Sequence, residues 1–69
     1  MNEATLKALL QKNSNDLEIT VKYDEGQRYN IIIDGEPLAS QRGKARIFRL
    51  PAAAEFLRGL GVTRFIVEN

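Results

Sequence analysis

The chain has 69 residues, a formal net charge of +1, and neither cysteine nor histidine. A chain this short forms one small domain and buries only about 60% of its unfolded surface, which makes a large enclosed active site improbable. The missing residue types exclude disulfides, thiol nucleophiles and most transition-metal sites. We therefore expect a cytoplasmic protein without a metal or a cofactor. With no run near the roughly 20 apolar residues that a membrane span needs, we expect no membrane partner either.

The first predicted element is a helix that begins after Asn2 and ends near Lys12. Asparagine is a favourable N-cap residue. Leu6, Leu9 and Leu10 follow at spacings that place them on one side of a helix. This stripe predicts a helix that packs through one narrow face, followed by a polar loop at residues 13–16.

Two strands and a turn are predicted next. Between residues 17 and 24, apolar and polar side chains alternate, which indicates a strand with one buried face made of Leu17, Ile19, Val21 and Tyr23. Residues 24–26 supply a turn that ends in Gly26, and the returning strand is residues 28–33. Asp34 and Gly35 then predict a type I′ hairpin, because that turn needs positive φ angles at both central positions.

The segment after this hairpin is expected to be an edge or an irregular lead-in over residues 36–41, because Pro37 cannot donate a ladder hydrogen bond. A bend at Arg42 and Gly43 leads to a third strand, residues 45–49. Within it Phe48 is predicted to face the core, since an inward Ile47 would carry Arg49 inward as well, at a heavy desolvation cost.

A second helix and a last strand complete the chain. Residues 51–60 form the helix, with Ala53, Phe56, Leu57 and Leu60 on one side and Gly61 as its stop. Residues 64–68 form the strand, with Phe65 and Val67 predicted in the core. A right-handed crossover would set this strand parallel to the third. The pattern leaves open whether it lies beside the third strand or beside the first.

These elements predict an α+β fold of two layers in a single domain, residues 1–69. The order is α-β-β-β-α-β, with a four-stranded mixed sheet covered by helices on one face. We call the opposite face of the sheet the outer face.

The charges are unevenly distributed along the chain. Residues 1–40 carry a net charge of −3 and residues 41–69 a net charge of +4, which hints at a polyanionic partner. The alternative is an ordinary solvated surface. Five basic residues are predicted to form one positive surface that binds the backbone of DNA: Arg42, Lys44, Arg46, Arg49 and Arg64.

A second candidate surface is the outer face. If Phe48, Phe65 and Val67 lie in the core with Ile31 and Ile33, the isoleucines between them turn outward. Ile32, Ile47 and Ile66 would then form an apolar patch contributed by three strands. Such a patch marks an interface, so the alternative function is homodimerisation or docking on a larger protein partner, without direct nucleic-acid contact.

Catalysis is not predicted. The acidic pairs Asp24 with Glu25 and Asp34 with Glu36 stand at turns, where aspartate is favoured for backbone reasons. Neither Ser14 nor Ser40 stands in a nucleophile elbow. We expect no enzyme activity and no small-molecule substrate.

The last third of the chain resembles a family of small bacterial accessory proteins, often encoded near plasmid partition genes. That family has an Arg-x-Phe-Arg segment, an Ala-rich helix, Leu-Gly and Arg-Phe-x-Val. The matching positions are Arg46, Phe48, Arg49, Ala53, Ala54, Leu57, Leu60, Gly61, Arg64, Phe65 and Val67. The resemblance implies a non-enzymatic helper of DNA maintenance or regulation. Lys44, Arg46, Phe48 and Ala53 also resemble the basic third strand and helix of arm-type DNA-binding domains of phage integrases.

Overall fold

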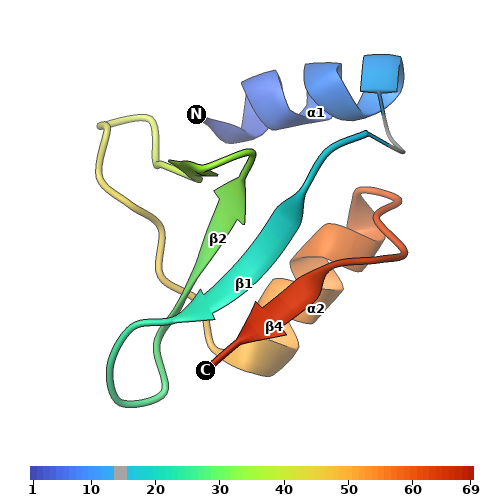
Figure 1. The fold of residues 1–69 in the computed structure, drawn as a ribbon. Helices are drawn as coiled ribbons and strands as arrows, with labels where there is room; N and C mark the ends of the chain where they lie inside the picture. Colours follow the sequence, from blue (N-terminus) through green and yellow to red (C-terminus); the bar gives the residue numbers. More distant parts are fainter. Residues whose placement is uncertain (14–15) are drawn as a thin grey trace.

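The computed structural model describes residues 1–13 and 16–69, so the centre of the predicted polar loop lies outside the described residues. Two helices and a four-stranded mixed sheet form a small α+β domain, as predicted (Figure 1). The elements in chain order are α1 (Glu3–Asn13), β1 (Ile19–Tyr23), β2 (Tyr29–Ile33), β3 (Glu36–Pro37), α2 (Leu50–Gly59) and β4 (Ile66–Glu68). Neither described helix is both long enough and apolar enough to span a bilayer.

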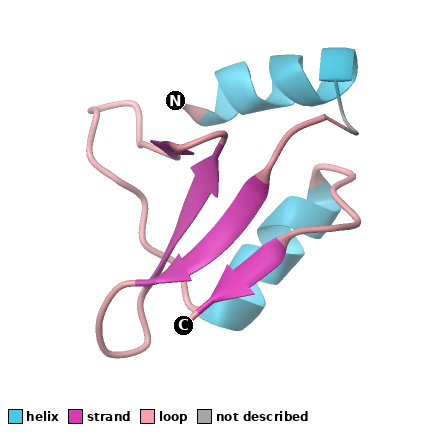
Figure 2. Cartoon of the chain, viewed as in Figure 1, coloured by secondary structure: helices cyan, strands magenta, loops and turns pink. Residues whose placement is uncertain are grey.

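The strands lie in the order β3-β2-β1-β4 (Figure 2). β1 and β2 are antiparallel, as are β2 and β3, whereas β4 runs parallel to β1. The last strand therefore lies beside the first strand, one of the two positions that the sequence left open. The direction predicted for it, parallel to residues 45–49, is confirmed, because both segments run antiparallel to β2.

The two local signals at the start of the chain and at the second hairpin are confirmed. The amide of Thr5 donates to Oδ1 of Asn2 at 2.8 Å, which caps α1. Asp34 and Gly35 have φ angles of 50° and 85°, the positive values that the hairpin turn requires. Asp34 also accepts a hydrogen bond from the amide of Glu18 at 2.9 Å through Oδ1, so its side chain fixes the turn against the start of β1.

The predicted third strand, residues 45–49, does not form as a regular strand. Only two isolated bridges occur, Ala39 with Ala45 and Tyr29 with Phe48. β3 is instead the two-residue segment that contains Pro37. Proline cannot donate, and the chain then leaves the sheet for a turn in which the amide of Ser40 donates to the carbonyl of Lys44 at 2.7 Å. These interruptions leave too few consecutive residues beside β2 for a ladder.

The core lies between the sheet and the two helices. Its buried apolar side chains are Leu6, Ile19, Val21, Ile31, Ile33, Leu38, Ala53, Leu57 and Val62. Phe48, Phe56, Leu60 and Phe65 pack against this cluster. The inward orientation of Ile31, Ile33 and Phe48 is therefore confirmed. Gly61 ends α2 with a φ angle of 90°, as predicted for a helix stop.

Candidate functional site

A row of side chains crosses the outer face of the sheet. Thr20 of β1 is paired with Ile32 of β2 on one side and with Ile66 of β4 on the other. Thr20 is buried at 8% exposure, Ile32 is half-buried, and Ile66 is 55% exposed. The row is therefore covered in the middle of the sheet and opens to solvent at β4.

Ile47 belongs to the same face but to a different part of it. Its neighbour Phe48 bridges Tyr29 in antiparallel register, so Ile47 lies alongside Asn30. Ile47 is 52% exposed, and the Oδ1 atom of Asn30 is buried without a hydrogen-bond partner among the described residues. Ile32, Ile47 and Ile66 thus all turn away from the core, although Ile32 is only partly accessible.

The two edges of the sheet differ in how open they are. At the β2 edge, the chain covers the strand twice: the amide of Leu38 donates to Ile31 at 2.7 Å, and Tyr29 and Phe48 exchange hydrogen bonds at 2.7 and 2.9 Å. The edge strand there contains proline. At the other edge β4 is the outermost strand (Figure 2). All three of its residues are exposed.

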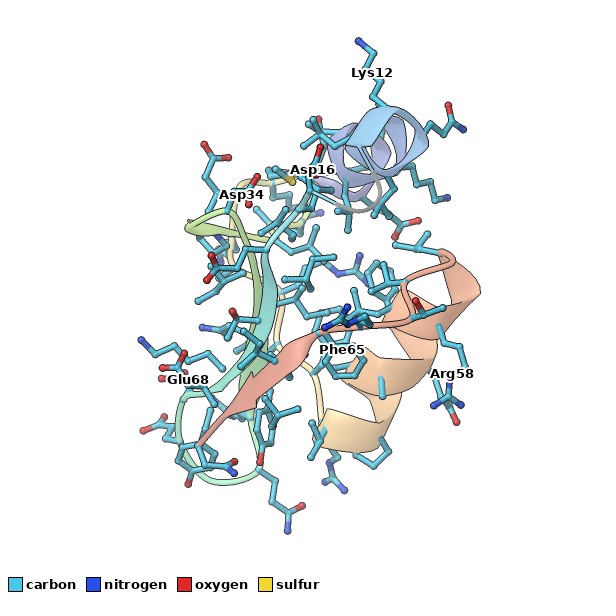
Figure 3. All side chains as sticks on the ribbon, turned by 45° about the vertical axis from the view of Figure 1, so that its right-hand side comes forward. Lys12, Asp16, Asp34, Arg58, Phe65 and Glu68 are labelled. Atoms are coloured by element: carbon cyan, nitrogen blue, oxygen red, sulfur yellow. The ribbon has the colours of Figure 1, made fainter. Side chains whose placement is uncertain are left out.

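The expectation that Val67 lies in the core is only partly right. Its partner in register is Val21, which is fully buried, so Val67 faces the helices as predicted. It is nevertheless 42% exposed, because no strand lies beyond β4 to cover it. Figure 3 shows Phe65 on the α2 side of the sheet and Glu68 directed away from α2. Phe65 is half-buried and packs on the core, so its predicted orientation is confirmed.

The five basic residues predicted to bind nucleic acid are spread over separate parts of the molecule. Arg42 and Lys44 are exposed on the loop at the left of Figure 1, whereas Arg64 is exposed in the segment at the right that leads into β4. Arg49 is exposed at the start of α2, where it occupies the N-cap position. The structure therefore does not gather these residues on one surface. Their binding role stays a prediction.

Arg46 differs from the other four because it is engaged within the fold. Its guanidinium lies 3.0 Å from Oε1 of Glu3 in α1, and it also lies 5.0 and 4.9 Å from the ring centres of Phe48 and Phe56. Hydrogen bonds from Lys7 and Arg46 lower the pKa of Glu3. Arg46 thus connects α1 to α2 across the end of the core.

The sequence contains a signal for this role of Arg46. Arg46 is two residues from Phe48, and in an extended segment such residues share a face. Once Phe48 is assigned to the core, Arg46 must point the same way and reach a carboxylate from there. The identity of that carboxylate depends on where α1 lies. The sequence pattern of residues 45–49 carries no information about that position.

One residue of each acidic pair at the turns has a partner within the fold. Asp34 accepts the amide of Glu18, and Glu25 lies 4.0 Å from Arg28 in an exposed ion pair. Within residues 1–13 and 16–69, no group of three or more acidic side chains is arranged to hold a metal ion.

Comparison with known proteins adds no further assignment. No protein-family model, curated protein or solved structure matches the chain.

Proposed function

We propose that the protein is a non-enzymatic assembly module that forms a homodimer through the exposed apolar side chains at the β4 end of its sheet. The observation that carries the proposal is the exposure of Ile66 on β4, at the end of the row that runs through Thr20 to Ile32. A large aliphatic side chain on an edge strand gains free energy when another surface covers it.

Two further observations favour a second copy as the partner. Val67 faces the other side of β4 and is also exposed, so both sides of this strand offer apolar surface. The domain is small and has no disulfide. Folds of this size commonly gain stability from oligomerisation, because a single small core supplies little net free energy.

Sedimentation equilibrium tests the proposal. The wild-type protein should show an average mass that rises from monomer toward dimer with concentration, and Ile66→Lys should remain a monomer with an unchanged circular dichroism spectrum. The matched control is Ile47→Lys, which introduces the same charge at an equally exposed isoleucine away from β4 and should leave the association unchanged. A wild-type protein that stays monomeric up to millimolar concentration would refute the proposal.

Association with DNA is the second candidate, in which the protein acts as an accessory of a DNA-maintenance complex. It is favoured by the exposure of Arg42, Lys44 and Arg49, since no described carboxylate forms an ion pair with them. Phosphate contacts by such residues would be weak singly and sensitive to salt. A dimer would strengthen them, because it doubles the number of basic residues on one particle.

A further inference from the structure

We propose that the homodimer forms by antiparallel pairing of β4 with β4 of a second copy, with the two-fold axis at Ile66. The two sheets would then join into one continuous sheet. This inference rests on the homodimer proposed above and specifies which edge is used and in which register.

The first argument is the state of the two edges. A strand with a neighbour on one side only leaves half of its backbone donors and acceptors directed outward, and these groups can pair with another strand. β4 has such an edge, with β1 on its inner side alone. The opposite edge is a poor alternative because β3 has two residues, one of them Pro37, and proline cannot donate.

The second argument is the order of side chains along β4 and the two residues that precede it. Residues 64–68 have the sequence Arg-Phe-Ile-Val-Glu. With the axis at Ile66, Arg64 lies opposite Glu68 of the second copy, Phe65 lies opposite Val67, and Ile66 meets its own equivalent. Every pair is then either oppositely charged or apolar, and both kinds stabilise antiparallel neighbours.

Other registers lack this match. A two-fold axis perpendicular to the sheet preserves its faces, so one residue must pair with itself. An axis at Val67 sets Glu68 opposite Ile66, and an axis at Phe65 sets Arg64 opposite Ile66. Both place a charge against an aliphatic side chain and lose the two ion pairs. Among these three registers, only the axis at Ile66 gives each of the five residues an oppositely charged or an apolar partner.

The third argument is that this pairing covers both exposed apolar residues of β4. On the helix side, Phe65 of one copy lies beside Val67 of the other, which supplies the neighbour that Val67 lacks. On the outer face, the two Ile66 side chains meet and join the rows that end in Ile32. Pairing of two short strands buries less surface than the roughly 800 Å² per partner of a typical stable interface, so we expect a weak dimer.

Charge reversal tests the register. Arg64→Glu sets the introduced carboxylate against Glu68 of the other copy at two symmetric places, and Glu68→Arg sets the introduced guanidinium against Arg64 in the same way. Each single variant should weaken the dimer by about tenfold to thirtyfold at low salt, for two pairs that change from attraction to repulsion. The double variant and an equimolar mixture of the two single variants should both recover association close to the wild-type value.

Arg58→Glu is the matched control, because it makes the same change in net charge as Arg64→Glu at an exposed residue of α2 directed away from Glu68 (Figure 3). Sedimentation equilibrium of all the samples separates the outcomes, with circular dichroism to verify folding. If association is weakened in both single variants and recovered in the double variant and in the mixture, the result supports the register. A wild-type dimer in which Arg64→Glu and Glu68→Arg behave like Arg58→Glu overturns the register and leaves the homodimer standing. A monomeric wild type overturns both.

Discussion

Replacing Ile31 by alanine should lower the free energy of unfolding by about 2 to 5 kcal/mol. Ile31 is fully enclosed in the centre of β2, between the neighbouring strands and the helices, so the removed methyl and methylene groups leave a cavity in the core. A domain of this length has a total stability of roughly 3 to 10 kcal/mol. The substitution should therefore remove a large share of the total stability, which urea denaturation followed by circular dichroism would measure.

Ile32→Ala provides the control for this change. It makes the same substitution one residue further along the same strand, on the outer face, where the side chain is already partly accessible to solvent. Its cost should be clearly smaller, about 1 kcal/mol. Equal losses for the two variants would contradict the assignment of faces in β2, and with it the position of the exposed row that ends at Ile66.

Arg46→Glu should cost about 2 kcal/mol of stability. The substitution removes two cation–π contacts, each of about 0.5 to 1 kcal/mol, and places a carboxylate where the guanidinium contacts Phe48, Phe56 and Glu3. Arg49→Glu is the control: Arg49 is exposed at the start of α2, so its reversal should change stability by less than about 0.5 kcal/mol. Urea denaturation of both variants at pH 7 gives the comparison, and equal midpoints would contradict the structural role of Arg46.

The same variant should also change the response to acid. The folded pKa of Glu3 lies below its unfolded value, so the contacts of Glu3 stabilise the fold at pH values above the unfolded pKa. That contribution is lost as the pH falls through the lower, folded pKa. The difference in stability between the wild type and Arg46→Glu should therefore narrow on acidification through this range.

The role of Arg46 changes how a nucleic-acid function has to be tested. Arg46 is one of the five residues predicted to bind nucleic acid, but its contacts with Glu3 and Phe48 mean that reversing its charge also disturbs the fold. A loss of DNA binding in an Arg46 variant would report unfolding as much as a lost phosphate contact. Arg42 and Lys44 are exposed on a loop and are the appropriate positions for such an experiment.

Local features of the fold were predictable because neighbouring residues determine them. The cap at Asn2, the turn at Asp34 and Gly35, and the stop at Gly61 each follow from backbone preferences that act within a few residues. These inferences do not depend on where distant parts of the chain lie. The inward orientation of Phe48 does depend on them, because alternation carries Arg46 inward with Phe48, and Glu3 of the distant α1 accepts its hydrogen bond.

The wrong predictions concern pairing between distant segments. Residues 45–49 have the alternation of a strand, but the proline and the turn before them leave only single bridges with the rest of the sheet. The position of β4, which the sequence left open between two places, depends on which edge is free once α2 has packed, and no local pattern contains that information. The exposure of Val67 follows from the same cause, since a side chain on the inner face is covered only where a neighbouring strand exists.

Amide hydrogen exchange at residues 66–68, measured as a function of protein concentration, tests the homodimer most directly. The outward amides of β4 should exchange rapidly in dilute solution and become protected as concentration rises, because a second strand then accepts their hydrogen bonds. The amide of Glu36 in β3 serves as the internal reference and should show no such dependence. Exchange at β4 that stays the same across the concentration series, while the protein remains folded, would contradict the account.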